Sequence, residues 1–115
     1  MIKIKRIYEQ PLKEDGFRVL VDRLWPRGMS KDRAKIDLWL KEIAPSDNLR
    51  EWFGHDPAKW ESFMKKYGAE LEKNRELLHR IRDIEREKGT VTLLYSAKDK
   101  EHNQAIALGS ILSKM

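Results

Sequence analysis

The amino-acid sequence predicts a single small α/β domain, residues 1–115, in which a mostly parallel or mixed sheet is packed by helices. The chain of 115 residues is long enough to bury one core and too short for two independent ones. Three short apolar or alternating runs have the length of strands, and segments with apolar residues at helical spacing separate the last two of them. With 40% apolar residues, the chain can build a packed core.

The three predicted strands differ in their patterns. Ile2 and Ile4 alternate with Lys3 and Lys5, a period of two that is typical of a strand and that could extend to Ile7. Residues 17–22 are β-branched and largely apolar, as in a strand covered on both faces, so we expect this strand to be central. Residues 91–95 form a third strand of the same buried type.

Capping residues mark the expected short helices. Ser30 is placed to cap a helix at 31–34, and Ser46 to cap a second one that ends at Gly54. Between them, residues 36–43 fit both an alternating strand and a helical face, and we favour the strand.

A longer helical segment begins at Asp56-Pro57, with aspartate as the cap and proline at the first helical position. Its apolar spacing continues as far as Gly89, and Gly68 and Lys73-Asn74 are the points at which it bends or divides. Residues 96–100 then lead from the third strand into a final helix.

Composition excludes several classes of function. The chain contains no cysteine, so disulfides, thiolate metal sites and cysteine nucleophiles are absent. No apolar run approaches the roughly 20 residues of a membrane span, so we expect a cytoplasmic protein without a membrane partner. The three histidines lack metal-ligand spacing, and no dinucleotide-binding, Walker or nucleophile-elbow motif occurs. We therefore expect neither a metal nor another cofactor.

The candidate site follows from the expected topology. If the strands at 17–22 and 91–95 are parallel, their carboxyl ends meet at one edge of the sheet, where open α/β sheets usually bind ligands. Arginine there would hold a phosphate or carboxylate with its planar fork of donors. Polar residues follow both strands, and the expected ligand-binding set is Asp22, Arg23, Arg27, Ser96, Lys98 and Asp99. This set predicts a pocket for a small anionic ligand.

Each of these residues also has a structural interpretation. Asp22 and Arg23 are equally suited to structural ion pairs, and Asp99 to capping the last helix. His55 and His102 are the candidate catalytic residues because histidine titrates near neutral pH, but a histidine in a turn more often makes a structural hydrogen bond. Whether the protein is an enzyme therefore stays open.

Two further interpretations remain. The net charge of +5 permits a nucleic-acid-binding module that contacts phosphates through Lys3, Lys5 and Arg6. Exposed tryptophans would instead make a homo-oligomer by forming a self-association surface. A cluster of five aromatic residues could stack on bases, but their helical spacing favours core packing: Trp39, Trp52, Phe53, Trp60 and Phe63.

Three blocks resemble the YeaO-like branch of domain-of-unknown-function family 488. They are residues 18–28 (RVLVDRLWPRG), 49–57 (LREWFGHDP) and 93–105 (LLYSAKDKEHNQA). The resemblance covers nearly the whole chain and implies a small bacterial or archaeal α/β protein of unassigned activity.

Other branches of that family carry a cysteine after the last strand and a Cys-His-Arg string further on. This sequence has Tyr95 or Ser96 at the first place and His102-Asn103-Gln104 at the second. Thiol chemistry therefore does not transfer to this chain. The location does transfer, because the family's motif loop coincides with the turn after residues 91–95.

Overall fold

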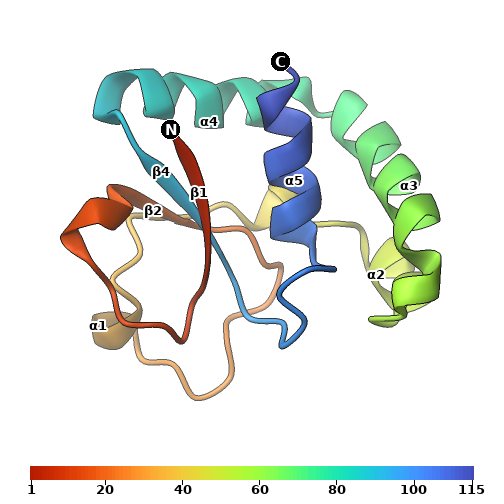
Figure 1. Cartoon of the computed structure of the whole chain (residues 1–115), viewed down its shortest axis with the longest axis horizontal. Coiled ribbons are helices and arrows are strands. Elements are labelled where there is room, and N and C mark those ends of the chain that lie inside the picture. Colours follow the sequence, from red (N-terminus) through yellow and green to blue (C-terminus); the bar gives the residue numbers. More distant parts are fainter.

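The computed structural model describes all 115 residues and contains one sheet of four parallel strands in the order β1-β4-β2-β3 (Figure 1). The strands are β1 (Ile2–Arg6), β2 (Phe17–Leu20), β3 (Leu38–Trp39) and β4 (Val91–Tyr95). The predicted α/β class is confirmed. The strand at 17–22 is indeed internal, although its ladder ends at Leu20, and β4 lies beside it.

Five α-helices accompany the sheet: α1 (Lys31–Ala34), α2 (Asp47–Phe53), α3 (Trp60–Glu72), α4 (Arg75–Lys88) and α5 (Gln104–Ser113). Short 3-10 turns cover Lys13–Asp15, Lys41–Ile43 and Pro57–Lys59. In Figure 1, α4 runs across the top of the molecule, α5 stands beside β1, between the strands and α3, and α3 extends from the end of α4 towards α2.

The caps predicted at Ser30 and Ser46 are confirmed, because each hydroxyl accepts the backbone N–H three residues on. Asp56 also caps a turn, but this turn is a 3-10 turn and the regular helix begins only at Trp60. The long helical segment divides at Lys73-Asn74, whereas Gly68 lies inside α3 without interrupting it.

The expected strand at 36–43 is mostly wrong. Only Leu38 and Trp39 pair with β2, and Lys41–Ile43 form a 3-10 turn. Leu40, just before this turn, and Ile43, its last residue, are buried in the main core without a longer ladder.

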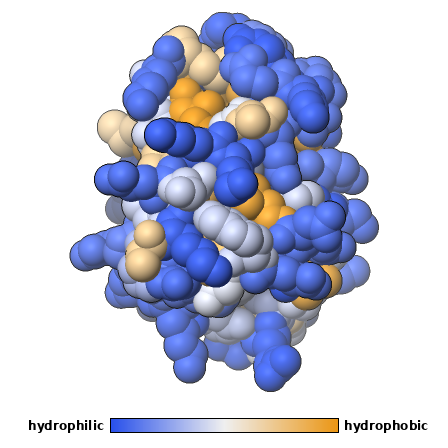
Figure 2. All heavy atoms as spheres, turned by 90° about the vertical axis from the view of Figure 1, so that its right-hand side faces the viewer, coloured by the Kyte–Doolittle hydropathy of each residue, from blue (hydrophilic) through white to orange (hydrophobic).

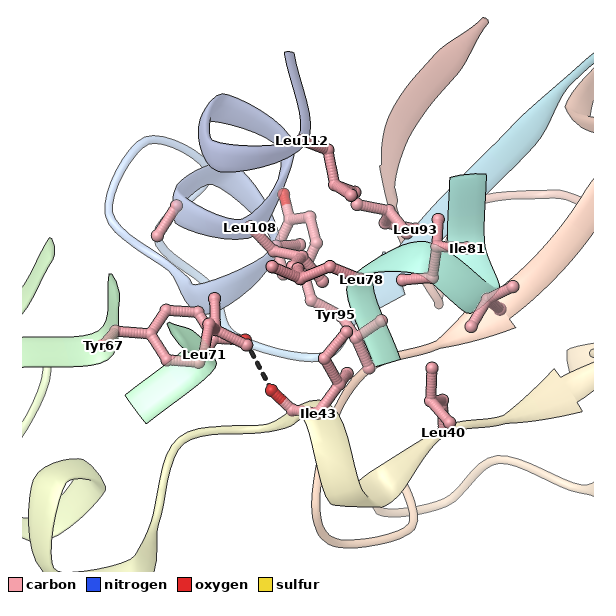
Figure 3. Close-up of a cluster of buried hydrophobic side chains, with 14 of the residues drawn as sticks. Leu40, Ile43, Tyr67, Leu71, Leu78, Ile81, Leu93, Tyr95, Leu108 and Leu112 are labelled. Carbon is pink, nitrogen blue, oxygen red and sulfur yellow. Dashed lines mark hydrogen bonds between the residues drawn. The ribbon is translucent and has the colours of Figure 1, made fainter. Parts of the chain in front are cut away.

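Two cores lie on the two faces of the sheet. The larger core holds the odd-numbered residues of β2 and β4, such as Val19 and Leu93, under α3, α4 and α5. Figure 3 shows how leucines of α3, α4 and α5 converge there with Tyr95. The smaller core holds Leu20 and Leu94 beside Ala34 of α1. The chain thus leaves β2 towards one face and leaves β4 towards the other.

No helix in the structure combines the length and the apolar character that crossing a membrane requires.

Candidate functional site

A cleft of about 310 Å³ opens at the carboxyl ends of β2 and β4. After β2 the chain continues to α1, and after β4 it continues to α5, which packs on the opposite face. Diverging connections of this kind leave a crevice between adjacent parallel strands, and ligands of open α/β sheets bind in such crevices. The topology thus explains why the hollow lies at this edge.

Most of the predicted site residues line this cleft. The structure brings together Asp22, Arg23, Arg27, His55, Ser96 and His102. Lys98 and Asp99 do not line it. The Lys98 side chain is exposed and makes no hydrogen bond or ion pair, and Asp99 supports the loop from outside.

Asp22 ties the two strand ends together. Its carboxylate is buried and accepts a hydrogen bond from the backbone N–H of Ser96 at 2.9 Å and another from the amide of Gln104. The Asp22 carbonyl accepts the indole N–H of Trp39 at 2.7 Å. No cation pairs with this carboxylate, so the ion pair considered for Asp22 is not found. Burial raises the pKa of Asp22, and the hydrogen bonds from Ser96 and Gln104 oppose that rise.

Arg23 is held against the wall of the cleft. Its guanidinium donates to the carbonyl oxygens of Ala44 at 3.2 Å and Pro45 at 3.3 Å, and its Nε lies 3.9 Å from a carboxylate oxygen of Asp47. These partners fix the plane of the guanidinium, so Arg23 is a positioned cation and not a mobile one.

Arg27 differs from Arg23 because its side chain is exposed in the cleft and makes no hydrogen bond or ion pair with the protein. The turn that carries it is well fixed. The hydroxyl of Tyr8 donates to the backbone carbonyl of Arg27 at 2.7 Å, and the indole of Trp25 donates to the carbonyl of Met29 at 2.6 Å. Gly28, with a φ of 74°, supplies the left-handed residue that this turn needs.

The two histidines have different surroundings. Nδ1 of His102 lies 2.9 Å from a carboxylate oxygen of Asp99, and because a carboxylate only accepts, Nδ1 carries the proton. The backbone N–H of Glu101 and the His102 side chain and backbone N–H together hold the pKa of Asp99 below its ordinary value. The ring of His55 makes no hydrogen bond, and its backbone has a φ of 57°.

Asp99 does not cap the last helix, contrary to one of its expected roles. The side chain of Asn103 accepts the N–H of Ile106 at 3.0 Å and is the cap of α5. Asp99 instead accepts the N–H groups of Glu101 and His102, which shapes the turn before Asn103.

Sequence reasoning missed several residues of the cleft. Arg50 reaches it from α2, and Gln104 reaches it from the first turn of α5. Gln104 had a usable signal, because it belongs to the string that stands where other branches of family 488 carry Cys-His-Arg. Arg50 had none, since nothing in the pattern of α2 distinguishes it from an ordinary surface arginine.

The cations of the proposed nucleic-acid face are largely engaged within the protein. Lys5 donates to both carboxylate oxygens of Asp15, and Arg6 donates to the carbonyls of Ser96 and Ala97. Lys3 donates to the carbonyl of Glu14 at 3.0 Å. Phosphate contacts through this face would compete with existing bonds.

The tryptophans do not form one surface. Trp52 is exposed, whereas Trp25 and Trp39 pack edge to face, with ring centroids 5.4 Å apart, and Trp60 stacks on Phe63. Figure 2 shows the side of the molecule that carries α2 and α3, where apolar residues appear as separate patches among hydrophilic ones.

The cleft gives no indication of a metal centre. Its acidic lining consists of Asp22 alone, and no group of three or more histidine, aspartate or glutamate side chains gathers anywhere in the structure.

Comparison with known proteins finds full-length similarity. The chain is 41% identical to "Uncharacterized protein YeaO" of Escherichia coli (strain K12) over 114 residues, which are 99% of this chain and 98% of that protein. It is 44% identical over 70 residues to "Uncharacterized protein Rv3073c" of Mycobacterium tuberculosis (strain ATCC 25618 / H37Rv), covering 61% of this chain and 59% of that protein. No solved structure matches the chain.

A family model named DUF488-N3i and described as "Inactive DUF488-N3 subclade" matches residues 1–115. Both findings agree with the resemblance that the three sequence blocks carry. The chain therefore belongs to the DUF488-N3i family, within domain-of-unknown-function family 488.

Proposed function

We propose that this protein binds a small phosphate- or carboxylate-bearing ligand in the cleft between β2 and β4, and that it does so without transforming the ligand. One observation carries the proposal: Arg27 presents a guanidinium in the cleft that no group of the protein satisfies. A planar fork of donors without partners suits an oxyanion, which can accept two parallel hydrogen bonds.

The charges around Arg27 support the same ligand class. Arg23 and Arg50 line the cleft with it, and the single acidic residue there, Asp22, is buried and already accepts two hydrogen bonds. An anion entering the cleft would meet three guanidinium groups, two of which, Arg23 and Arg50, also lie 3.9 and 3.5 Å from the exposed carboxylate of Asp47. A cation would be repelled by these arginines, so the site selects for negatively charged ligands.

The reactive side chains that are available fit ligand binding better than they fit catalysis. The chain has no cysteine, and thiol chemistry is what the cysteine-bearing branches of family 488 would supply. The hydroxyl of Ser96 makes no hydrogen bond to a histidine, so it lacks the adjacent base that activates a serine nucleophile. The description of the family as an inactive subclade points the same way.

The test is a thermal-shift comparison of three proteins: the wild type, Arg27→Ala, and Arg80→Ala. Arg80 is an exposed arginine of α4 that lies outside the cleft, so its removal matches the loss of charge but not the loss of the site. The ligands are inorganic phosphate, sulfate, acetate and short oligonucleotides. A ligand that binds only the native state raises the melting temperature.

We expect phosphate, at about ten times its dissociation constant, to raise the melting temperature of the wild type and of Arg80→Ala by roughly 5–10 °C. Arg27→Ala should lose most of this shift. Equal shifts in all three proteins would contradict the proposed site. Stabilisation by oligonucleotides alone would replace a small-ligand pocket with a nucleic-acid interface.

A further inference from the structure

The cleft combines its cations with a continuous set of aromatic rings. Phe53 at the end of α2 stacks on Phe63 of α3, with ring centroids 4.4 Å apart, and both line the cleft. His55 lies 6.4 Å from Phe53, measured between ring centroids. Trp60 connects the set to His102, because its ring is 5.6 Å from Phe63 and 5.3 Å from His102. We call these five residues the ring wall.

Part of the ring wall is accessible from the cleft. His55 is exposed and His102 is partly exposed, although one side of the His102 ring packs against Trp60, and both histidines line the cleft. Phe53 and Phe63 are buried, and they support the histidines from the core, His55 through Phe53 and His102 through Trp60. The wall thus offers flat, rigid surfaces, against which a ligand ring can stack or pack edge to face.

The charge of the cleft favours a doubly charged group over a singly charged one. Three arginines line it, and the side chains of Arg27 and Arg50 are exposed to solvent, Arg27 without a partner and Arg50 at 3.5 Å from a carboxylate oxygen of Asp47. Because attraction grows in proportion to ligand charge, a phosphate monoester gains more from these groups than a carboxylate does. A phosphate monoester also has one more terminal oxygen than a carboxylate, so it can accept hydrogen bonds from more than one guanidinium.

The volume of the cleft limits the size of the organic group that the phosphate can carry. About 310 Å³ lies at the lower end of the range of roughly 300–1,000 Å³ that is usual for small-molecule sites. A phosphate and one ring system fit this space, whereas an extended polymer would have to pass out of the cleft.

We infer that the ligand of this cleft is a phosphate monoester that carries an aromatic ring, with its phosphate at Arg27 and Arg50 and its ring against His55 and His102. This inference rests on the proposed anion site and narrows its ligand class. It predicts that the affinity has two separable parts, one from charge and one from the ring.

Isothermal titration of the wild type with four probes separates the two parts. The probes are inorganic phosphate, phenyl phosphate, cyclohexyl phosphate and phenol. Cyclohexyl phosphate matches phenyl phosphate in charge and approximate size but lacks the flat ring. We expect phenyl phosphate to bind about tenfold more tightly than inorganic phosphate, and about threefold more tightly than cyclohexyl phosphate, because ring pairs add to simple apolar burial.

Two variants assign the ring preference to the wall. His55→Gly removes an exposed ring and suits the positive φ at this position, so it should fold normally. Phe53→Leu keeps an apolar residue but removes the supporting ring. Each variant should still bind inorganic phosphate, while the preference for phenyl over cyclohexyl phosphate should fall to about unity in at least one of them.

The possible failures are distinguishable. If the wild type binds inorganic phosphate but shows no preference for the phenyl ester, the aromatic ligand class is wrong and the anion site stands. An unchanged preference in both variants would also overturn the assignment to the ring wall. If none of the three phosphates binds, both this inference and the proposed function are wrong.

Discussion

The buried carboxylate of Asp22 accepts a hydrogen bond at 2.9 Å from the backbone N–H of Ser96, 74 residues further along the chain. This bond joins the end of β2 to the end of β4 at the place where their connections diverge. Asp22 also accepts from Gln104, so the same carboxylate holds the first turn of α5. This one side chain therefore links three segments that line the cleft.

Replacing Asp22 with alanine should lower the free energy of unfolding by about 1–3 kcal/mol, because the N–H of Ser96 loses its acceptor. Asp22→Asn should cost less, since an amide oxygen can still accept from Ser96 and the Gln104 amide can turn to present its oxygen. Urea denaturation of the two variants and the wild type measures the difference. An alanine variant as stable as the asparagine variant would show that the bond to Ser96 contributes little.

The stability of the wild type and that of Asp22→Asn should depend on pH in different ways. Burial raises the pKa of Asp22 above its ordinary value of 3.8, so the folded protein binds more protons at this site than the unfolded chain between the two values. The contribution of Asp22 to stability therefore falls as pH rises from about 4 through the raised pKa. Relative to the wild type, Asp22→Asn should gain stability over this window. Urea denaturation at several pH values tests this, and parallel curves would contradict it.

Asp15 is expected to behave in the opposite way. It is buried between Arg18, whose guanidinium lies 2.5 Å away, and Lys5 at 3.1 Å. Burial alone would raise the pKa of Asp15, but hydrogen bonds from the N–H of Leu12, from Lys5 and from Arg18 together lower it. Its stabilisation is thus present above the ordinary value of 3.8 and is lost as pH falls through the lowered pKa.

Asp15→Ala should cost about 3–5 kcal/mol at neutral pH, because it leaves the buried Arg18 without its anionic partner. Asp32→Ala is the matched control, since Asp32 is an exposed aspartate of α1 that makes no ion pair, and its loss should change stability by about 0.5 kcal/mol or less. Urea denaturation compares them. Equal losses would show that the network around Asp15 is not stabilising.

Periodicity and capping residues were sufficient to predict most of the fold. The largely apolar runs of β2 and β4 reflect their burial, and the caps at Ser30 and Ser46 are local interactions that a short window of sequence contains. The short length of β3 was not predictable in this way. A strand paired with β2 and a buried 3-10 turn both need apolar residues at these positions, so the pattern does not distinguish them.

The location of the candidate cleft was predictable, but its composition was predictable only in part. Parallel strands place their ends together, so Asp22 and Ser96 were expected to meet. Gln104 and Arg50 reach the cleft only through the packing of α5 and α2, and no local pattern encodes that approach. Lys98 also follows β4, but it lies two residues beyond Ser96, and its exposed side chain stays outside the cleft.

Two glycines with positive φ should respond differently to alanine. Gly16 has a φ of 63°, and a Cβ there would overlap the carbonyl oxygen of Thr90 and lie 2.8 Å from its Cβ. That carbonyl cannot move freely, because it accepts the N–H of Phe17 at 2.9 Å. Gly28 has a φ of 74° but open space around it. Gly28→Ala should cost about 1–2 kcal/mol from backbone strain alone.

Gly16→Ala should carry the same strain and an additional cost of about 1–3 kcal/mol from the overlap. Thermal or urea unfolding of the two variants gives the difference directly. Similar losses at both positions would mean that the chain around Thr90 can shift to accept a methyl group.

Tyr67 connects the core to the segment that holds Arg23. Its side chain is fully buried, and its hydroxyl donates to the carbonyl of Ile43 at 2.7 Å, the bond drawn in Figure 3. Burial raises the pKa of Tyr67 well above its ordinary value, so the hydroxyl stays a donor throughout the accessible pH range. The residues that follow Ile43 supply the carbonyls to which Arg23 donates.

Tyr67→Phe should therefore cost about 1–2 kcal/mol, because the carbonyl of Ile43 stays buried without a donor. Tyr8→Phe is its control: this hydroxyl also donates to a carbonyl, that of Arg27, but the site is exposed and water can replace the donor. Its loss should change stability by about 0.5 kcal/mol or less. Urea denaturation measures both, and equal costs would show that burial does not strengthen the bond from Tyr67.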